Sequence, residues 1–128
     1  MTEKELLKKA AKATNRKRHP IIADAWSGDG FELMRDASMS IRVPTVWNPL
    51  DDDGDAIRLA VKLRISLIHE QEYMGGPVLE TVEAITAPIS GDGKRTCTTE
   101  CINEQGCDEM ARVRLAITRA AAAMAEKE

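Results

Sequence analysis

The sequence predicts an α+β domain: a three-layer α/β/α sandwich with an antiparallel sheet of three or more strands and about three helices. Capped amphipathic patterns predict helices before and after residues 65–102, and that segment reads as strands. Turn-forming residues rich in glycine and proline separate these strands, so consecutive strands are expected to pair antiparallel. This order of elements is typical of a layered α+β domain.

Composition indicates one globular domain spanning residues 1–128. Of the 128 residues, 43% are apolar and 30% are charged, and a chain of this length buries about two-thirds of its unfolded surface. A net charge of −3 argues against a domain that grips nucleic acid by bulk charge, and 3% aromatic residues provide few stacking platforms. No segment resembles a membrane span or a signal peptide, so we expect a cytoplasmic location without membrane contact.

The first predicted helix runs from Thr2 to about Arg16. Thr2 and Glu5 have the spacing of a capping box, in which the two side chains satisfy free backbone donors reciprocally. Apolar residues form one stripe, with lysines on the opposite face. His19 and Pro20 end any helix, because proline disfavours helical geometry in the residue before it.

Residues Ile21 to Val46 show no clear period. The composition of residues 26–30, Trp-Ser-Gly-Asp-Gly, predicts a turn. Phe31–Met34 and Ser40–Val46 are either short strands or parts of a loop that packs through its own apolar side chains.

The clearest helix signal lies in Pro49 to Arg64. Four aspartates, at positions 51, 52, 53 and 55, precede or open an apolar-periodic run, where they cap free N–H groups and complement the helix dipole. Trp47 and Leu50 flank the helix start and are expected to pack as a hydrophobic staple.

Three strands follow. Ile65–Met74 and Val78–Ala87 form a hairpin around the turn at residues 75–77, and residues 90–93 form a second turn. The Thr- and Cys-rich run Lys94–Ile102 is the third strand, followed by a loop at residues 103–106.

The last helix is predicted from Asp108 to about Ala125. Asp108 is its expected N-cap, and an alanine run at residues 120–123 favours helix and permits close approach of another backbone. One face carries the apolar residues Met110, Val113, Ile117, Ala120, Ala121 and Met124.

No group of residues meets the spacing rules of a metal or cofactor site. A calcium loop built around Gly54 would place Pro49 and Ala60 at ligand positions. Cys97 and Cys101 would lie about 13 Å apart on a strand, too far to share a zinc ion unless this stretch is a loop. We expect both thiols to fill the buried face of the strand, and Cys107 has no base that the sequence places near it.

No catalytic residue is predicted either. His69 has no serine or cysteine placed near it and is expected to be a surface or hydrogen-bonded core residue. The glycines at residues 28–30 and 91–93 lack phosphate-loop spacing and are assigned to turns. Four glutamates are expected to form the solvated face of a sheet rather than a carboxylate pair: Glu70, Glu72, Glu80 and Glu83.

Basic residues gather in the segment 8–18. They are expected to form a solvated helix face and its exit, and nucleic-acid contact is the alternative. The residues are Lys8, Lys9, Lys12, Arg16, Lys17 and Arg18.

The string WNPLDDDGDAIRLAVKL, from Trp47 to Leu63, resembles the signature of the phage ABA sandwich domain family of small uncharacterised phage and prophage proteins. The resemblance rests on the Trp-Asn-Pro-Leu lead and the Asp-Ala-x-x-Leu-Ala helix occurring together. The alanine-rich end, Ala111 to Ala123, is also similar. The resemblance implies a layered α/β/α fold and a phage protein in the host cytoplasm, with no established activity, cofactor or catalytic residue.

The sequence favours a non-enzymatic phage accessory protein that interacts with a protein partner, of the phage or the host, or with itself. Small size, a pI near 5.5 and an alanine-rich last helix suited to burial in a partner motivate this hypothesis. One alternative is a weak nucleic-acid binder through the segment 8–18. Another is a small ligand-binding domain or enzyme on the exposed face of the sheet, which requires a concave pocket with converging polar groups.

Overall fold

The structure is a computed structural model that describes residues 2–36, 39–73, 78–86, 97–103 and 108–126. These residues form three helices and five strands. In chain order they are α1 (Glu3–Ala13), β1 (Trp26–Asp36), β2 (Met39–Trp47), α2 (Asp53–Leu63), β3 (Ser66–Tyr73), β4 (Val78–Ile85), β5 (Cys97–Cys101) and α3 (Glu109–Glu126). The predicted turns at 75–77 and 90–93, the loop after Asn103, and Cys107 lie outside the described residues.

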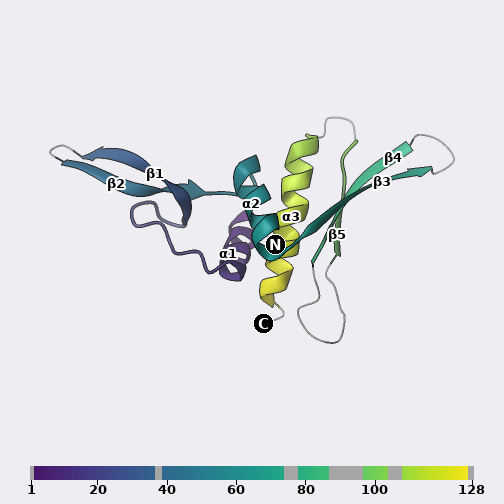
Figure 1. The fold of residues 1–128 in the computed structure, drawn as a ribbon, viewed down its shortest axis with the longest axis horizontal. Helices are drawn as coiled ribbons and strands as arrows, with labels where there is room; N and C mark the ends of the chain where they lie inside the picture. The colour runs from purple at the N-terminus through teal and green to yellow at the C-terminus, as the bar shows by residue number, and fades with distance from the viewer. Residues whose placement is uncertain (1, 37–38, 74–77, 87–96, 104–107, 127–128) are drawn as a thin grey trace.

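The helices lie together in the middle of the molecule, between two separate antiparallel sheets (Figure 1). One sheet is the meander β3-β4-β5, and α3 packs against β4 and β5. The other is the two-stranded hairpin β1-β2, which extends away from the helices on the opposite side (Figure 1). The α+β class, the three helices and the antiparallel meander are confirmed, and an α/β/α order of layers stays a prediction.

Local capping explains where the helices begin. The predicted capping box is present in α1, where Thr2 Oγ1 accepts from the Glu5 N–H and a Glu5 carboxylate oxygen accepts from the Thr2 N–H, both at 3.3 Å. In α2, Asp52 is the N-cap and its carboxylate accepts from the Asp55 N–H at 2.8 Å. The predicted N-cap of α3, Asp108, accepts from the N–H groups of Met110 and Ala111.

Two helix boundaries differ from the prediction. Helix α1 ends at Ala13 rather than near Arg16, because Asn15 takes a left-handed backbone conformation with φ of 55°. Helix α2 begins at Asp53 rather than near Pro49, because Asn48 instead closes a turn by accepting from the Leu50 N–H at 3.0 Å.

The core is built where the helices meet the meander. Ala10 and Ala11 of α1 belong to the same buried cluster as Ala120 and Ala121 of α3, and α1 packs on α3. Small side chains let these two helix backbones approach closely. The alanine-rich face of α3 is therefore buried within this chain, which overturns the expectation that a partner covers it. Met110, assigned to the same apolar face, is 46% exposed.

Residues 26–30 form the start of β1, so the predicted turn is wrong. The β1-β2 register shifts between Ser27 and Phe31, which marks a bulge-like irregularity at the two glycines. A Cβ atom on Gly28 would lie 2.3 Å from Thr45 Oγ1, so glycine serves close strand approach here rather than a turn. Of the two alternatives for Phe31–Met34 and Ser40–Val46, the strands are correct.

Candidate functional site

The acidic cluster before α2 acts as a helix cap, as predicted. Asp55 is buried, accepts from the Asn48 N–H at 3.0 Å and pairs with Arg58 at 2.8 Å. Within the described part of the chain, no group of three or more His, Cys, Asp or Glu residues is placed to hold a metal ion.

The two described cysteines do not fill the buried face of β5, contrary to expectation. Cys97 is exposed and Cys101 is half-buried. The face toward α3 carries Thr98, whose hydroxyl donates to the Ala116 carbonyl at 2.8 Å, and Glu100. Desolvation, and then the Glu83 carboxylate 3.5 Å from the sulfur, raises the pKa of the Cys97 thiol, which disfavours the reactive thiolate.

Glu100 is a buried charge that the sequence does not predict. Its side chain is only 8% exposed, and it forms ion pairs with Arg119 and, at 3.5 Å, with Arg112. Both arginines come from α3, so this cluster joins the last helix to the last strand. A buried ion pair of this kind has a structural role at the interface between helix and sheet.

His69 lines a surface hollow of about 430 Å³ beside the β3-β4 pair. The other lining residues are Glu70, Gln71, Glu80, Thr81 and Ile102. Gln71 donates to Glu80 at 3.2 Å, and this lining contains no serine or cysteine to act as a nucleophile beside His69. His69 is exposed, as expected of a surface residue. The glutamates do not share one face as predicted: Glu80 pairs with Gln71 on the face that carries Val82, whereas Glu70 and Glu83 lie on the other face, where they pair with Thr81 and Ile68.

The basic segment 8–18 is divided between solvent and internal contacts. Lys8, Lys12 and Lys17 are exposed. Arg16 is occupied: it forms two hydrogen bonds to Asp29 at 2.8 and 3.0 Å, donates to the Ser27 carbonyl, and stacks over the Trp47 ring at 5.2 Å. The segment is therefore no continuous surface of free cations.

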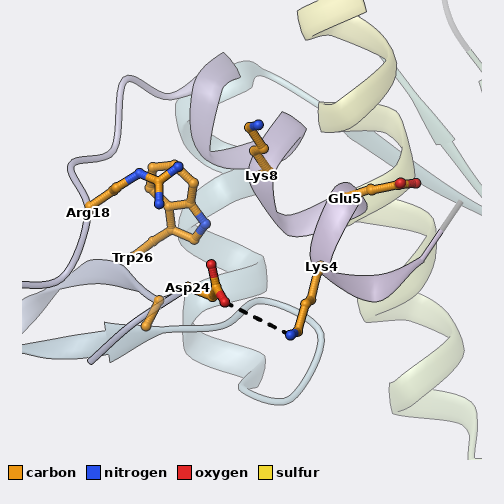
Figure 2. Close-up of a pocket in the computed structure, with 7 residues that line it drawn as sticks. Lys4, Glu5, Lys8, Arg18, Asp24 and Trp26 are labelled. Atoms are coloured by element: carbon orange, nitrogen blue, oxygen red, sulfur yellow. Dashed lines mark ion pairs between the residues drawn. The ribbon is translucent and has the colours of Figure 1, made fainter.

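A small pocket of about 160 Å³ lies between α1 and the start of β1 (Figure 2). The Arg18 guanidinium lies 5.5 Å from the centre of the Trp26 ring, and Lys4 pairs with Asp24 at 4.0 Å. Lys8 also lines the pocket. Two acidic side chains, Glu5 and Asp24, offset its cations, so the pocket does not select strongly for anions.

The hairpin β1-β2, hereafter the arm, exposes large apolar side chains. Phe31 is 58% exposed, Leu33 is 64% exposed and Ile41 is 41% exposed. Two isolated strands are marginally stable in water, and exposed apolar edge strands are association sites. In the sequence, the alternation Phe31-Glu32-Leu33 indicates a strand with one apolar face. The alternation does not tell whether a helix covers that face, so the exposure of Phe31 and Leu33 is known only from the structure.

The base of the arm is held by the segment before it. The buried His19 accepts at Nδ1 from the N–H groups of Ile21 and Ile22 at 3.2 and 3.1 Å. Its Nε2 therefore carries the proton and donates to the Pro44 carbonyl at 2.7 Å. The hydrogen bonds of His19 and the Arg16–Asp29 pair together fix the position of the arm relative to the segment that precedes it.

Comparison of the chain with protein-family models, with curated proteins and with solved structures gives no significant match. The resemblance to the phage ABA sandwich domain family therefore stays a prediction. None of the described helices combines the length and the apolar character that crossing a membrane requires.

Proposed function

We propose that this chain is a non-enzymatic protein-interaction module whose contact surface is the arm. The observation that carries the proposal is an anchored hairpin whose outer part exposes Phe31 and Leu33 at 58% and 64%. A rigid base reduces the entropy lost on binding, and exposed apolar side chains supply the surface that binding buries.

The remaining surfaces support a binding role rather than an enzymatic one. The hollow at His69 offers an amide and carboxylates without a paired nucleophile, and the raised pKa of Cys97 disfavours thiolate chemistry. A role as a phage or prophage accessory protein in the host cytoplasm is part of the proposal, and it rests on the family resemblance of residues 47–63 and 111–123.

Contacts within the chain occupy two arginines of the basic segment 8–18, which weakens the alternative of nucleic-acid binding. Arg16 is committed to Asp29 and Arg18 stacks on Trp26, so phosphate contact falls to the exposed lysines. Charge reversal at Lys8, Lys12 and Lys17 is the matched test for that alternative.

The testing experiment is affinity capture of the tagged protein from infected host cells, with and without nuclease. Phe31→Ser with Leu33→Ser removes the apolar surface of the arm. Ile57→Ser with Val61→Ser removes exposed apolar groups of α2, which are 48% and 59% exposed, and serves as the matched control.

We expect that a partner protein is captured both with and without nuclease. The Phe31→Ser, Leu33→Ser variant should no longer capture this partner, whereas the Ile57→Ser, Val61→Ser variant should still capture it. Capture that is unchanged in the arm variant contradicts the assignment of the surface. Capture that nuclease abolishes and that requires the three lysines favours nucleic-acid binding instead.

A further inference from the structure

The pairing of β1 with β2 determines which backbone groups of β1 point outward. Pro44 lies opposite Phe31, has no N–H, and its carbonyl accepts from His19, which lies outside the hairpin pair. The Phe31–Pro44 pair is therefore a non-hydrogen-bonded pair. Because such pairs alternate along an antiparallel ladder, Leu33 and Arg35 also direct their N–H and C=O groups away from β2.

Beyond the base of the arm, the described residues leave the outer edge of β1 unpaired. Among the described residues, the segment before the arm makes backbone contact with β1 at Trp26 and Ser27, through the Arg18–Trp26 bridge and the Ser27 N–H to Lys17 carbonyl bond, and its Arg16 side chain reaches Asp29. No further strand of the described residues pairs with β1. Phe31, Leu33 and Arg35 thus offer three N–H and three C=O groups in one row, centred on Leu33.

We propose that this edge pairs with the same edge of a second copy of the chain, antiparallel and centred on Leu33. A two-fold axis perpendicular to the hairpin places Leu33 opposite Leu33 of the second copy, and Phe31 opposite Arg35 of the second copy. The two hairpins then form one four-stranded sheet. This inference rests on the proposed function, for which it names the partner.

In this register, the side chains of Phe31, Leu33 and Arg35 in one copy are complementary to the same three side chains in the second copy. The central Leu33 pair is apolar, and each flanking pair places a guanidinium beside an aromatic ring. The Phe31 ring already receives one guanidinium, from Arg42 at 5.1 Å. Arg35 is exposed and forms no ion pair with the described residues, and no like charges stand opposite each other among these three positions.

The other edge of the arm is unsuited to pairing of this kind. On β2, Pro44 removes a donor and His19 occupies its carbonyl. Pairing through β1 buries less surface than the ~1,200 Å² of a standard interface, so we expect a weak, concentration-dependent dimer.

Disulfide trapping tests the register. In a background with Cys97, Cys101 and Cys107 replaced by serine, Leu33→Cys places two thiols on residues about 5.5 Å apart at Cα, within disulfide range. Glu32→Cys is the matched control, because it lies on the same exposed strand but its two copies are offset diagonally by about 8 Å. We expect oxidation to trap the Leu33→Cys dimer at least about tenfold faster than the Glu32→Cys dimer.

A mixture of two variants tests the flanking pairs. Phe31→Cys mixed with Arg35→Cys is expected to form a mixed disulfide, whereas either variant alone is not. Sedimentation across a concentration series then tests association without a cross-link. Leu33→Pro removes one outward N–H but no bond within the hairpin, so we expect it to shift the protein to monomer while the circular dichroism spectrum is preserved.

Equal trapping at positions 32 and 33, or a monomer at every concentration, overturns the inference. A monomer whose arm still captures another protein overturns the self-pairing alone and leaves the proposed function intact. If the Leu33→Pro protein does not fold, disulfide trapping of the cysteine variants still tests whether two copies pair through β1.

Discussion

The two sheets of this molecule bury their residues in different ways. In the meander, Val82 and Ala84 are fully buried, and helix α3 covers the face on which they lie. In the arm, Phe31 and Leu33 remain more than half exposed on a sheet that has two strands among the described residues. The difference shows that one sheet is held by apolar packing along its face, whereas the other is held at one end, where Trp47 joins the buried core cluster and polar contacts add to that packing.

The polar contacts of the arm come from a short stretch of chain. Arg16 binds Asp29 and the Ser27 carbonyl, and His19 binds the Pro44 carbonyl. From α2, Arg58 approaches Asp29 at 3.8 Å. These contacts fix the base and leave the outer part of the arm free to meet a partner.

Removing packing from the core should have the largest effect. Leu59→Ala in α2, at a side chain only 2% exposed, is expected to lower the free energy of unfolding by about 3 kcal/mol through the cavity it creates. Urea denaturation followed by circular dichroism measures this loss. Ile57→Ala on the same helix, 48% exposed, should change it by less than about 1 kcal/mol. Equal losses for the two variants would show that α2 is not packed as described.

Removing the histidine contact should loosen the arm but not the meander. His19→Ala leaves one carbonyl and two N–H groups without their partner, at a cost of about 2 kcal/mol. Amide hydrogen exchange in β1 and β2 should therefore accelerate by about 30-fold, while β3 to β5 keep their rates.

His19→Asn sharpens this test. The Asn side-chain oxygen can replace Nδ1 as an acceptor near the Ile21 N–H but does not reach Pro44, so an intermediate acceleration is expected. Equal acceleration in both sheets would contradict a local role for His19.

The elements that were predictable from the sequence are those whose signals are local. The capping box of Thr2 and Glu5, the N-caps Asp52 and Asp108, and the meander all follow from spacing within a few residues. For the arm, the sequence does not distinguish strands from a loop, because the anchoring of the arm depends on pairs such as His19 with Pro44, 25 residues apart.

The cysteines illustrate the same limit. Alternation along β5 places Cys97 and Cys101 on one face, but it does not say which face meets a helix. The hydroxyl of Thr98 and the charge of Glu100 are buried only because α3 supplies the Ala116 carbonyl and two arginines. The sequence of β5 alone does not show that partners from α3 will satisfy these buried polar groups.

A smaller effect is expected from adding one methyl group to the start of β1. In Gly28→Ala, the new Cβ would meet Thr45 Oγ1 at 2.3 Å and the Thr45 carbonyl oxygen at 2.8 Å, so the strands must separate locally at a cost of about 1–2 kcal/mol. In Gly30→Ala, the nearest atom is Thr45 Cγ2 at 3.2 Å, and a side-chain adjustment suffices. Hydrogen exchange in the arm should therefore rise more for Gly28→Ala. The reverse order would contradict the close approach at Gly28.

The smallest expected effect is a dependence of arm stability on pH. The hydrogen bond from Arg16 lowers the pKa of Asp29 below its ordinary value of 3.8, with further contributions from the charges of Arg16 and Arg58. A lowered pKa in the folded state means that the stabilisation is fully present above pH 3.8 and is lost as the pH falls through the folded-state pKa. Because the Asp29 side chain is 57% exposed, solvent screening limits the effect to less than about 1 kcal/mol.

Asp29→Asn isolates that contribution. The difference in arm stability between the unchanged protein and Asp29→Asn, measured by hydrogen exchange or urea midpoint, should be constant above about pH 5 and should shrink toward pH 3. Asp24→Asn is the control, since Asp24 is 69% exposed and meets Lys4 only at 4.0 Å, so its difference should stay near zero throughout. A difference for Asp29→Asn that does not change with pH would mean that the carboxylate charge does not help to hold the arm. The arm would then depend on His19, on the stacking of Arg16 over Trp47 and on the Arg16 bond to the Ser27 carbonyl, none of which involves that charge.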